Sequence, residues 1–374
     1  MSQFSDIEDD TPFAVFLNPQ RINHRNRKGI ELKRFDGTME SLKCCSINLL
    51  QQILRFWINI GDYIQSIAVR AFCDTVDIFL EREELHTYNK NKIKVILNGW
   101  FMHNPANWPP SDSITPKITS FHIDPDSVPL MLKDSGIAWL KTHGPVGCRD
   151  YWTKALLDKY GIPCYFSGCL TLTLGAKYKA AERDGKIYFV DAPLKRPGIR
   201  TLMAYIPVLA TSWLKILKIH KRQNKSVIDA ALFYCIYRQI LTDDILLNGE
   251  FLSHNFPADM LPDNKKRFEL AEELIKKYAK ADLVITSLLH CALPCLGLGI
   301  PVIFIPDSID DERFGGLIEL LRVMTFGRKG LETEDETIKN MAGKISGKTK
   351  INNKREYITI KDKLEKECRE FMDS

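Results

Sequence analysis

The fold is decided by the stretch from Leu283 to Ile305, LVITSLLHCALPCLGLGIPVIFI, which contains no Asp, Glu, Lys or Arg. A run of this length would cross a bilayer if it were a single helix. Its ends are instead rich in β-branched residues, and Gly297, Gly299 and Pro301 interrupt its second half. We therefore predict a strand, a turn, a short helix and a second strand. Strands buried on both faces of a parallel sheet are continuously apolar, which explains the missing charges.

The first half of the chain shows the same alternation of strands and helices. We predict its strands at 94–97, 117–122, 137–140 and 164–166. Apolar residues recur at helical spacing after Gly61 and again around 155–157. Alternating strands and helices with short links indicate an α/β fold with a largely parallel sheet. Ligands of such folds bind at the carboxyl ends of the strands.

Length and composition indicate more than one domain. The chain has 374 residues, of which 45% are hydrophobic and 26% charged, and this length exceeds a single hydrophobic core. We divide it into an N-terminal extension (1–45), a first Rossmann-like lobe (46–185), a second Rossmann-like lobe with a helical insert (186–328) and a Lys-rich C-terminal segment (329–374). The extension shows little periodicity, so its structure is left open.

Charge and cysteine content exclude several functional classes. The net charge of +5 is too small for a dedicated nucleic-acid-binding protein, although it suits small anionic ligands. The ten cysteines lack the spacing of a disulfide framework, and the acidic N-terminus lacks the features of a secretory signal. We therefore expect a cytoplasmic protein with reduced thiols and no transmembrane segment. Its Lys-rich C-terminal segment is expected to form a solvated helix face, with contact to the inner membrane surface as the alternative.

The most informative polar residue is His290, which lies where the strand predicted at 283–286 passes into the short helix. The first amides of a helix have no intrahelical acceptor, and the helix dipole favours negative charge there. His290 and the nearby Ser287 are therefore candidates for binding phosphate or carboxylate. The alternatives are a buried core histidine and, less favoured, a zinc site with Cys291 and Cys295, where paired cysteines and carboxylates are lacking. We expect no metal.

Other candidates lie at the ends of predicted strands or on loops. Arg149 follows a glycine turn and suits bidentate binding of a carboxylate or phosphate, with an ion pair to Asp150 as the alternative. His122 is a candidate for proton transfer or for holding a sugar hydroxyl, or else a loop histidine without a catalytic part. Asp62 either orients a hydroxyl or caps the helix that follows. His254 lies on a polar loop that could face the cleft between the lobes.

In their order and spacing, five segments resemble the polysaccharide pyruvyl transferase family. They are Asn59–Asp62, Asn98–Trp100, Gly147–Asp150, Ser167–Thr171 and Ala281–Pro301, and the likeness spans about 57–325. The resemblance implies two Rossmann-like lobes in a GT-B-like arrangement. It also implies an enzyme of polysaccharide biosynthesis that transfers the enolpyruvyl unit of phosphoenolpyruvate to a sugar or lipid-linked oligosaccharide as a ketal, with no cofactor besides this co-substrate.

Ketal formation needs an acid, a base and groups that hold an anion. A proton is delivered to the methylene carbon of phosphoenolpyruvate, a sugar hydroxyl attacks the resulting cationic centre, phosphate leaves and a second hydroxyl closes the ring. We take His290 as the first catalytic candidate, either as the proton donor or as a partner of the ligand's anionic groups, and His122 as the second. The substrate-binding candidates are Arg149, Ser287, Asp62, Asn98, Gly99 and His254.

One position departs from the family pattern. The family typically has Ser-Arg-Leu-His or Ser-Arg-Ile-His at this loop, with the Arg among its ligand-binding residues, whereas this chain has Leu288. An apolar side chain cannot hold a carboxylate. Either another cation compensates, with Arg149, Arg313 and Lys141 as the candidates, or the ligand differs, or the activity is lost.

Two other functions therefore stay open. A GT-B glycosyltransferase using a nucleotide sugar would share the two-lobed fold, and Asp311 and Glu319 are spaced like the paired acids of some such enzymes. A non-catalytic member of the family would bind a glycan or a partner enzyme. His103 and Trp108 offer an aromatic platform for a sugar, with a packed loop as the alternative.

Overall fold

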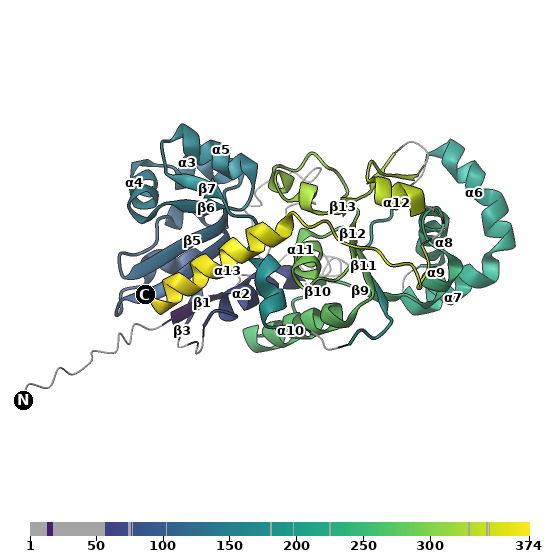
Figure 1. Ribbon diagram of the computed structural model, residues 1–374, viewed down its shortest axis with the longest axis horizontal. Helices are drawn as coiled ribbons and strands as arrows, with labels where there is room; N and C mark the ends of the chain where they lie inside the picture. Colours follow the sequence, from purple (N-terminus) through teal and green to yellow (C-terminus); the bar gives the residue numbers. More distant parts are fainter. Residues whose placement is uncertain are drawn as a thin grey trace, which may run out of the picture.

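The computed structural model describes residues 13–17, 57–73, 76, 78–101, 103–179, 182–196, 198–223, 226–327, 330–341, 343 and 345–374. These residues form two α/β lobes that lie side by side, and a helix near the C-terminus runs along the first lobe (Figure 1). Each lobe contains a parallel sheet with helices around it. The fold is therefore mixed α/β, and it is consistent with the predicted pair of Rossmann-like lobes in a GT-B-like arrangement.

The sheet of the first lobe has six parallel strands in the order β3-β1-β4-β5-β6-β7. They are β3 (Ile78–Glu81), β1 (Phe13–Leu17), β4 (Ile93–Trp100), β5 (Ile114–His122), β6 (Val146–Cys148) and β7 (Cys164–Phe166). Strand β4 is buried along most of its length, as a central strand of a parallel sheet should be. Strand β1 comes from the segment whose structure the sequence left open, so the sheet includes residues that precede the boundary drawn at 46.

The helices of the first lobe correct one prediction. They are α3 (Val128–Met131), α4 (Asp134–His143) and α5 (Tyr151–Lys159), and the links between elements contain the 3₁₀ turns η2 (Arg82–Thr87), η3 (Pro105–Asn107), η4 (Pro125–Ser127) and η5 (Leu170–Ala176). The strand predicted at 137–140 is wrong, because these residues lie within α4. The buried residues of this helix are Gly136, Trp139 and Leu140, whose spacing marks one helical face.

The sheet of the second lobe has five parallel strands in the order β13-β12-β11-β8-β9. They are β13 (Arg322–Val323), β12 (Val302–Phe304), β11 (Leu283–Thr286), β8 (Ile187–Val190) and β9 (Glu250–Leu252). The uncharged stretch forms β11, α11 (Leu289–Gly297) and β12, and Val284 pairs with Val302 across the two strands. This confirms the predicted strand, helix and strand. Gly299 makes the turn before β12 with a φ of +73°, which favours glycine.

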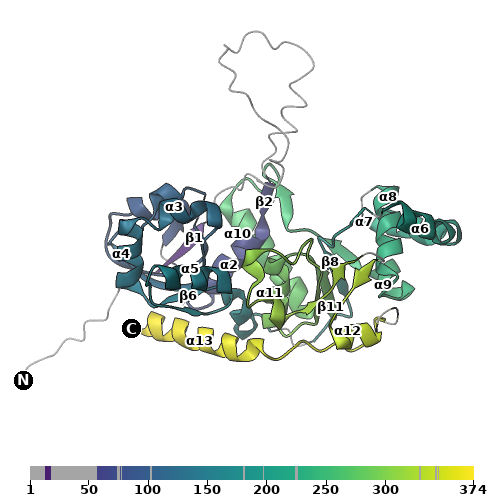
Figure 2. The same cartoon turned by 90° about the horizontal axis from the view of Figure 1, so that it is seen from above.

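The remaining elements surround the second sheet. They are α6 (Ile199–Thr211), α7 (Trp213–Gln223), α8 (Val227–Tyr237), α9 (Asp243–Asn248), β10 (Asn255–Pro257), α10 (Asn264–Lys280), η6 (Glu312–Phe314), η7 (Ile318–Leu320), β14 (Thr325–Phe326), β15 (Leu331–Glu332) and α12 (Glu336–Met341). The residues after Gly316 form only the short turn η7. Helices α6 and α7 lie at the end of the molecule that is remote from the first lobe (Figure 2). No single helix of the described ranges is long and apolar enough to cross a membrane; α6 and α7 reach that length only as a pair bent by 96°.

Several connections join the lobes. Strand β2 (Trp57–Asn59) pairs antiparallel with β10, and α2 (Ile60–Arg70), which starts directly after β2, packs against α10 and α11 through the largest apolar cluster of the molecule. Helix α13 (Tyr357–Asp373) returns to the first lobe, where Glu367 pairs with Lys117 at 3.1 Å and contacts the Tyr165 hydroxyl. Through these connections, the carboxyl end of β11, the strand that precedes α11, lies close to the start of α2.

Candidate functional site

His290 is the second residue of α11 and lies at the boundary between the lobes. The helix has Leu288 as its N-cap residue, in an extended conformation and with no side-chain capping bond. Because leucine has no acceptor, the cap leaves the first amides of α11 to other partners. The His290 side chain is 18% exposed, so the imidazole is not sealed in the interior. The plain alternative of a buried core histidine therefore does not describe it.

Helix α2 of the first lobe supplies the polar partners of His290. Asp62 Oδ1 lies 3.4 Å from His290 Nδ1, and Gln65 Nε2 lies 3.1 Å from Nε2. Gln65 also donates to Asp62 Oδ1 at 3.4 Å, so the three side chains form a connected network. A Cβ atom at Gly61 would lie 2.7 Å from the Cβ of His290. Glycine at this position therefore permits the close approach of α2 to α11.

Asn59, Asn98 and Gly99, which lie at or near the ends of strands β2 and β4, hold α2 in place. Asn59 caps the helix, since its side chain accepts a hydrogen bond from Gly61 N at 2.9 Å; the cap is thus not Asp62, which points its carboxylate to His290. Asn98 Nδ2 donates to the Gln65 carbonyl at 3.2 Å. A Cβ at Gly99, whose φ is +94°, would lie 2.8 Å from Gln65 Oε1. Asn98 and Gly99 therefore position Gln65.

His254 and Ser287 form hydrogen bonds within the second lobe. His254 is fully buried, with Nε2 2.7 Å from the Tyr278 hydroxyl. Burial, with a contribution from His290, lowers the pKa of His254 to about 3, so its ring is neutral. The polar loop that was expected to present His254 to the cleft instead turns the ring inward, where a Cβ at Gly61 would lie 3.1 Å from its Nδ1. Ser287 Oγ donates to the Asp191 carbonyl at 2.8 Å and is half-buried.

His122 and Asp150 form a second, buried pair in the first lobe. His122 Nδ1 lies 2.6 Å from Asp150 Oδ2 and 3.1 Å from Thr153 Oγ1, and its ring is 1% exposed. Burial and the charge of Arg149 lower the pKa of His122 despite Asp150, while the bond from His122 and the charge of Arg149 hold the pKa of Asp150 below its ordinary value despite burial.

This pairing fixes the tautomer of His122. A neutral imidazole that donates from Nδ1 to an ionised carboxylate presents an acceptor at Nε2. Within the described part of the chain, Nε2 of His122 has no hydrogen-bond partner. Asp150 is held in turn, because its Oδ1 accepts the Thr153 amide at 2.8 Å and so caps α5. The arrangement is that of a base oriented by a carboxylate.

Arg149 is a buried cation with little direct pairing. Its side chain is 3% exposed, and its nearest acid is Asp150, with 3.8 Å between Nε and Oδ2. That carboxylate is already engaged by His122 and Thr153, and Arg149 Nε finds no hydrogen-bond partner among the residues that the structure describes. Burial lowers the pKa of Arg149, and the charges of Asp62 and Arg313 also act on it. A desolvated guanidinium of this kind favours an anionic ligand.

The second lobe contributes Arg313 and a cavity beside it. Arg313 donates from Nε to Asp311 Oδ1 at 2.7 Å, and its charge acts on both His122 and Arg149. The adjacent cavity has a volume of about 430 Å³ and is lined by Trp152 of the first lobe and by Asp311, Glu319 and neighbouring residues of the second. This volume is within the range of small-molecule sites. Asp311 and Glu319, which are spaced like the paired acids of some glycosyltransferases, thus line the same cavity.

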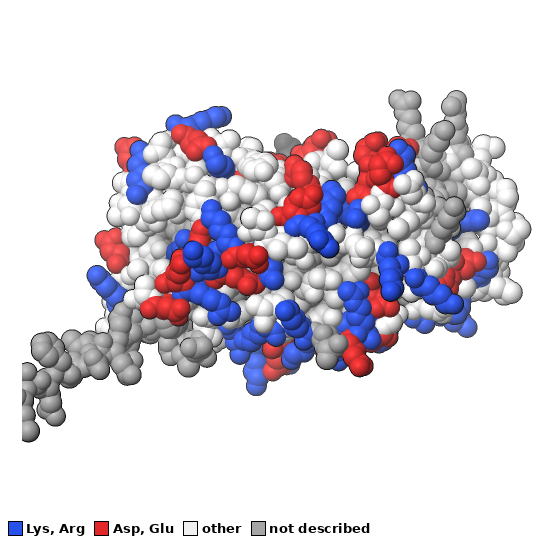
Figure 3. Space-filling view, viewed as in Figure 1, with Lys and Arg blue, Asp and Glu red and all other residues white. Residues whose placement is uncertain are grey.

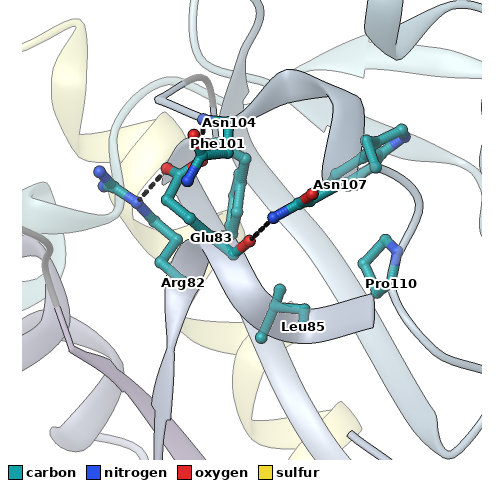
Figure 4. Close-up of a pocket in the computed structure, with 8 residues that line it drawn as sticks. Arg82, Glu83, Leu85, Phe101, Asn104, Asn107 and Pro110 are labelled. Carbon is teal, nitrogen blue, oxygen red and sulfur yellow. Dashed lines mark hydrogen bonds and ion pairs between the residues drawn. The ribbon is translucent and has the colours of Figure 1, made fainter. Parts of the chain in front are cut away.

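The aromatic loop of the first lobe is packed and encloses only a very small cavity. Figure 4 shows Glu83 between Arg82 and the two asparagines Asn104 and Asn107, with Nδ2 of Asn107 donating to the Glu83 carbonyl at 2.9 Å. The cavity beside them has a volume of about 10 Å³, room for one water and not for a sugar. Trp108 is buried there edge-on to a second tryptophan, so the packed-loop alternative describes it.

Sequence reasoning missed Gln65 and the pairing of His122 with Asp150. Gln65 follows Asp62 by three residues on the same face of α2, and this spacing was a signal that could have identified it. Lys141, considered as a compensating cation, is exposed on α4. In the ranges that the structure describes, no three His, Cys, Asp or Glu side chains converge in a way that could hold a metal ion.

Comparison with known proteins gives one match. A family model described as polysaccharide pyruvyl transferase matches residues 59–308. The matched range runs from the cap of α2 to the loop after β12, and it contains His290, Asp62, Gln65, His122 and Arg149. No curated protein and no solved structure matches the chain significantly.

Proposed function

Since the chain belongs to the polysaccharide pyruvyl transferase family, we propose that it transfers the enolpyruvyl unit of phosphoenolpyruvate to a sugar and forms a ketal. The observation that supports this most is the His290 network, in which an imidazole at the start of α11 meets Asp62 and Gln65 of the other lobe. Such a position serves a ligand that is anionic and must receive a proton.

His290 is the proton donor in this proposal. Asp62, at 3.4 Å from Nδ1, stabilises a protonated imidazole electrostatically. Gln65 Nε2 donates to Nε2 of the neutral ring, so the Gln65 amide turns its oxygen to the ring when His290 is protonated. The proton moves from His290 to the methylene carbon of phosphoenolpyruvate, and positive charge develops at the carbon that carries the phosphate and carboxylate. The oxygen of a sugar hydroxyl then forms a bond to that carbon, the bond from that carbon to the phosphate oxygen breaks and phosphate departs with the electron pair. A second hydroxyl of the same sugar closes the ketal, and its proton returns to His290.

Arg149 holds the anionic groups of the donor and compensates for Leu288. Leu288 packs against the largest apolar cluster, which joins the lobes, and offers no charge to a ligand. Arg149 has the buried, poorly paired guanidinium that an anion would satisfy, and the amides at the start of α11 add donors from the opposite lobe. Arg313 adds positive charge nearby, although Asp311 neutralises part of it.

His122 is the base that receives the proton of the attacking hydroxyl. Its Nε2 is the acceptor of a neutral imidazole whose other nitrogen is fixed by Asp150. The cavity of about 430 Å³ beside Trp152 accommodates the sugar, because acids such as Asp311 and Glu319 accept hydrogen bonds from hydroxyls and the indole covers an apolar sugar face. The two histidines thus divide the acid and base steps between the lobes.

The deciding experiment incubates the full chain with phosphoenolpyruvate and a panel of activated sugars. We expect acceptor-dependent release of phosphate together with the methyl NMR signal of a pyruvate ketal. The variant His290→Gln should lose at least about 100-fold in rate, the usual contribution of a positioned acid. The control His86→Gln changes a histidine that is exposed on η2 and should keep full activity. Absence of both signals across the panel would contradict transfer.

Thermal shift separates this proposal from the two other functions. Only a ligand that binds the folded state raises the unfolding midpoint, so phosphoenolpyruvate should do so and nucleotide sugars should not. The opposite result would favour a glycosyltransferase that uses Asp311 and Glu319. If phosphoenolpyruvate stabilises only the variant Leu288→Arg, the natural chain is a non-catalytic member of the family.

A further inference from the structure

The insert of the second lobe exposes a concentrated apolar surface. Seven of the fifteen exposed large apolar side chains in the described ranges lie between 199 and 228, and their exposed fractions run from 48% to 82%. They are Ile199, Leu202, Met203, Ile206, Trp213, Leu214 and Ile228. We call the part on α6 and α7 the insert surface. Figures 1 and 2 place it at the far end of the second lobe.

Helix α6 is apolar on two faces. Ile199, Leu202, Met203 and Ile206 follow the spacing of one helical stripe and point to solvent. On the other side, Tyr205 is buried, and Val208 and Leu209 pack against the apolar cluster of this lobe. The inner face therefore accounts for the attachment of α6 to its lobe, and the outer stripe is available for another partner. Large exposed apolar patches of this kind mark interaction sites.

The charged residues of the segment that forms this surface are all basic. The segment 192–228 contains eight Lys and Arg residues and no Asp or Glu, which leaves 44 basic against 47 acidic residues in the rest of the chain. The positive net charge of the protein therefore resides in this segment. Lys218, Lys221 and Arg222 are exposed on α7. The end of the molecule where α6 lies is largely free of acidic side chains in Figure 3.

The Lys-rich C-terminal helix α13, in contrast, contains both basic and acidic residues. On α13, Lys361, Lys363 and Lys366 each pair with the glutamate four residues later. These cations are compensated locally, which is typical of a solvated helix face. In the segment 192–228, Lys215 pairs with Asp243, an acid that lies outside this segment.

We propose that the insert surface docks on an anionic phospholipid bilayer, lying in the interface and not crossing it. The apolar stripe of α6 and the exposed indole of Trp213 enter the boundary between headgroups and acyl chains, and the cations of α7 contact lipid phosphates. The 96° bend between α6 and α7 suits two short helices on one surface better than a span. A second copy of the chain is a poorer partner, since it would bring a second uncompensated set of cations to the same interface.

The test is co-sedimentation of the full chain with vesicles, which needs no substrate and so does not depend on the proposed transfer. We expect binding to vesicles of phosphatidylcholine and phosphatidylglycerol in equal amounts, and much weaker binding to phosphatidylcholine alone or at high salt. Lys218→Ala with Lys221→Ala should weaken binding by about 25-fold, at about fivefold for each cation near the surface. Leu214→Ser should also weaken binding at either salt concentration.

Two matched controls alter similar residues elsewhere. Met260→Ser changes a side chain that is 64% exposed outside the insert, and Lys363→Ala changes an exposed cation of α13, so both should bind vesicles normally. Circular dichroism verifies that each variant is folded. If the intact chain fails to bind anionic vesicles, the proposal is wrong. It is equally wrong if light scattering shows a dimer that Leu214→Ser dissociates while vesicle binding is unaffected.

Discussion

Replacing Gly61 by alanine should damage the site more than the fold. The added Cβ would lie 2.7 Å from His290 Cβ and 2.9 Å from Asn59 Oδ1. Carbon atoms in contact prefer separations of about 3.5–4.0 Å, so α2 and α11 would have to separate by about 1 Å. Alanine gains about 1 kcal/mol of helix propensity, whereas overpacking costs about 1–3 kcal/mol. The free energy of unfolding should therefore fall by no more than about 2 kcal/mol.

The effect on catalysis should be larger, because displacing a reacting group by about 1 Å can reduce the rate about 100-fold. The assay is kcat/KM for acceptor-dependent phosphate release by Gly61→Ala, with urea unfolding of the same variant. Gly198→Ala is the matched control, since no heavy atom of the described residues lies within 4 Å of its added Cβ. If Gly61→Ala retains the kcat/KM of the natural chain, the contact between α2 and α11 does not position the imidazole.

Three further predictions concern the other groups of the site. Arg149→Met keeps the length of the side chain and removes its charge, so the KM for phosphoenolpyruvate should rise at least about tenfold, as for loss of a charge-assisted bond, and an unchanged KM would exclude an anion-binding role. His122→Gln should lower kcat by about 100- to 10,000-fold while phosphoenolpyruvate still raises the thermal midpoint; a retained kcat would mean that His122 is not the base. Acid should destabilise the fold through His254, because burial lowers its pKa to about 3 and the unfolded chain, titrating near 6.5, takes up the proton first. Its contribution to the free energy of unfolding should thus fall by about 2 kcal/mol between about pH 8 and about pH 5, seen as a pH dependence of urea unfolding that His254→Asn lacks.

The elements that could be predicted from the sequence are those whose signal is contained in a short window. The stretch 283–305 predicts β11, α11 and β12, because its apolar ends, glycines and missing charges fit a doubly covered parallel sheet and little else. The four residues 137–140 were too few to reveal helical spacing, which becomes visible only when Gly136 is included. Strand β1 was missed because its five apolar residues stand alone in a polar segment.

The site was predictable only as far as strand ends could be located. His290, Asp62 and Asn98 were identified because polar residues at the carboxyl ends of strands meet at one edge of a sheet. Their partners depend on how the lobes approach each other. Gln65 and His290 are separated by 225 positions, and no local pattern relates them. His122 and Asp150 are neighbours because β5 lies beside β6, an order that the sequence does not specify.

Under the proposed function, Leu288 changes which lobe supplies the positive charge that holds the ligand. In the family's usual pattern, the arginine and the histidine stand on the same loop of the second lobe. Here the second lobe keeps His290 and the amides of α11, while the buried cation Arg149 follows β6 in the first lobe. Under the proposed function, the donor's anionic groups therefore connect the two lobes, and neither lobe alone supplies both charge and proton. Binding must then depend on the packing of α2 against α11, which is the contact that Gly61 permits.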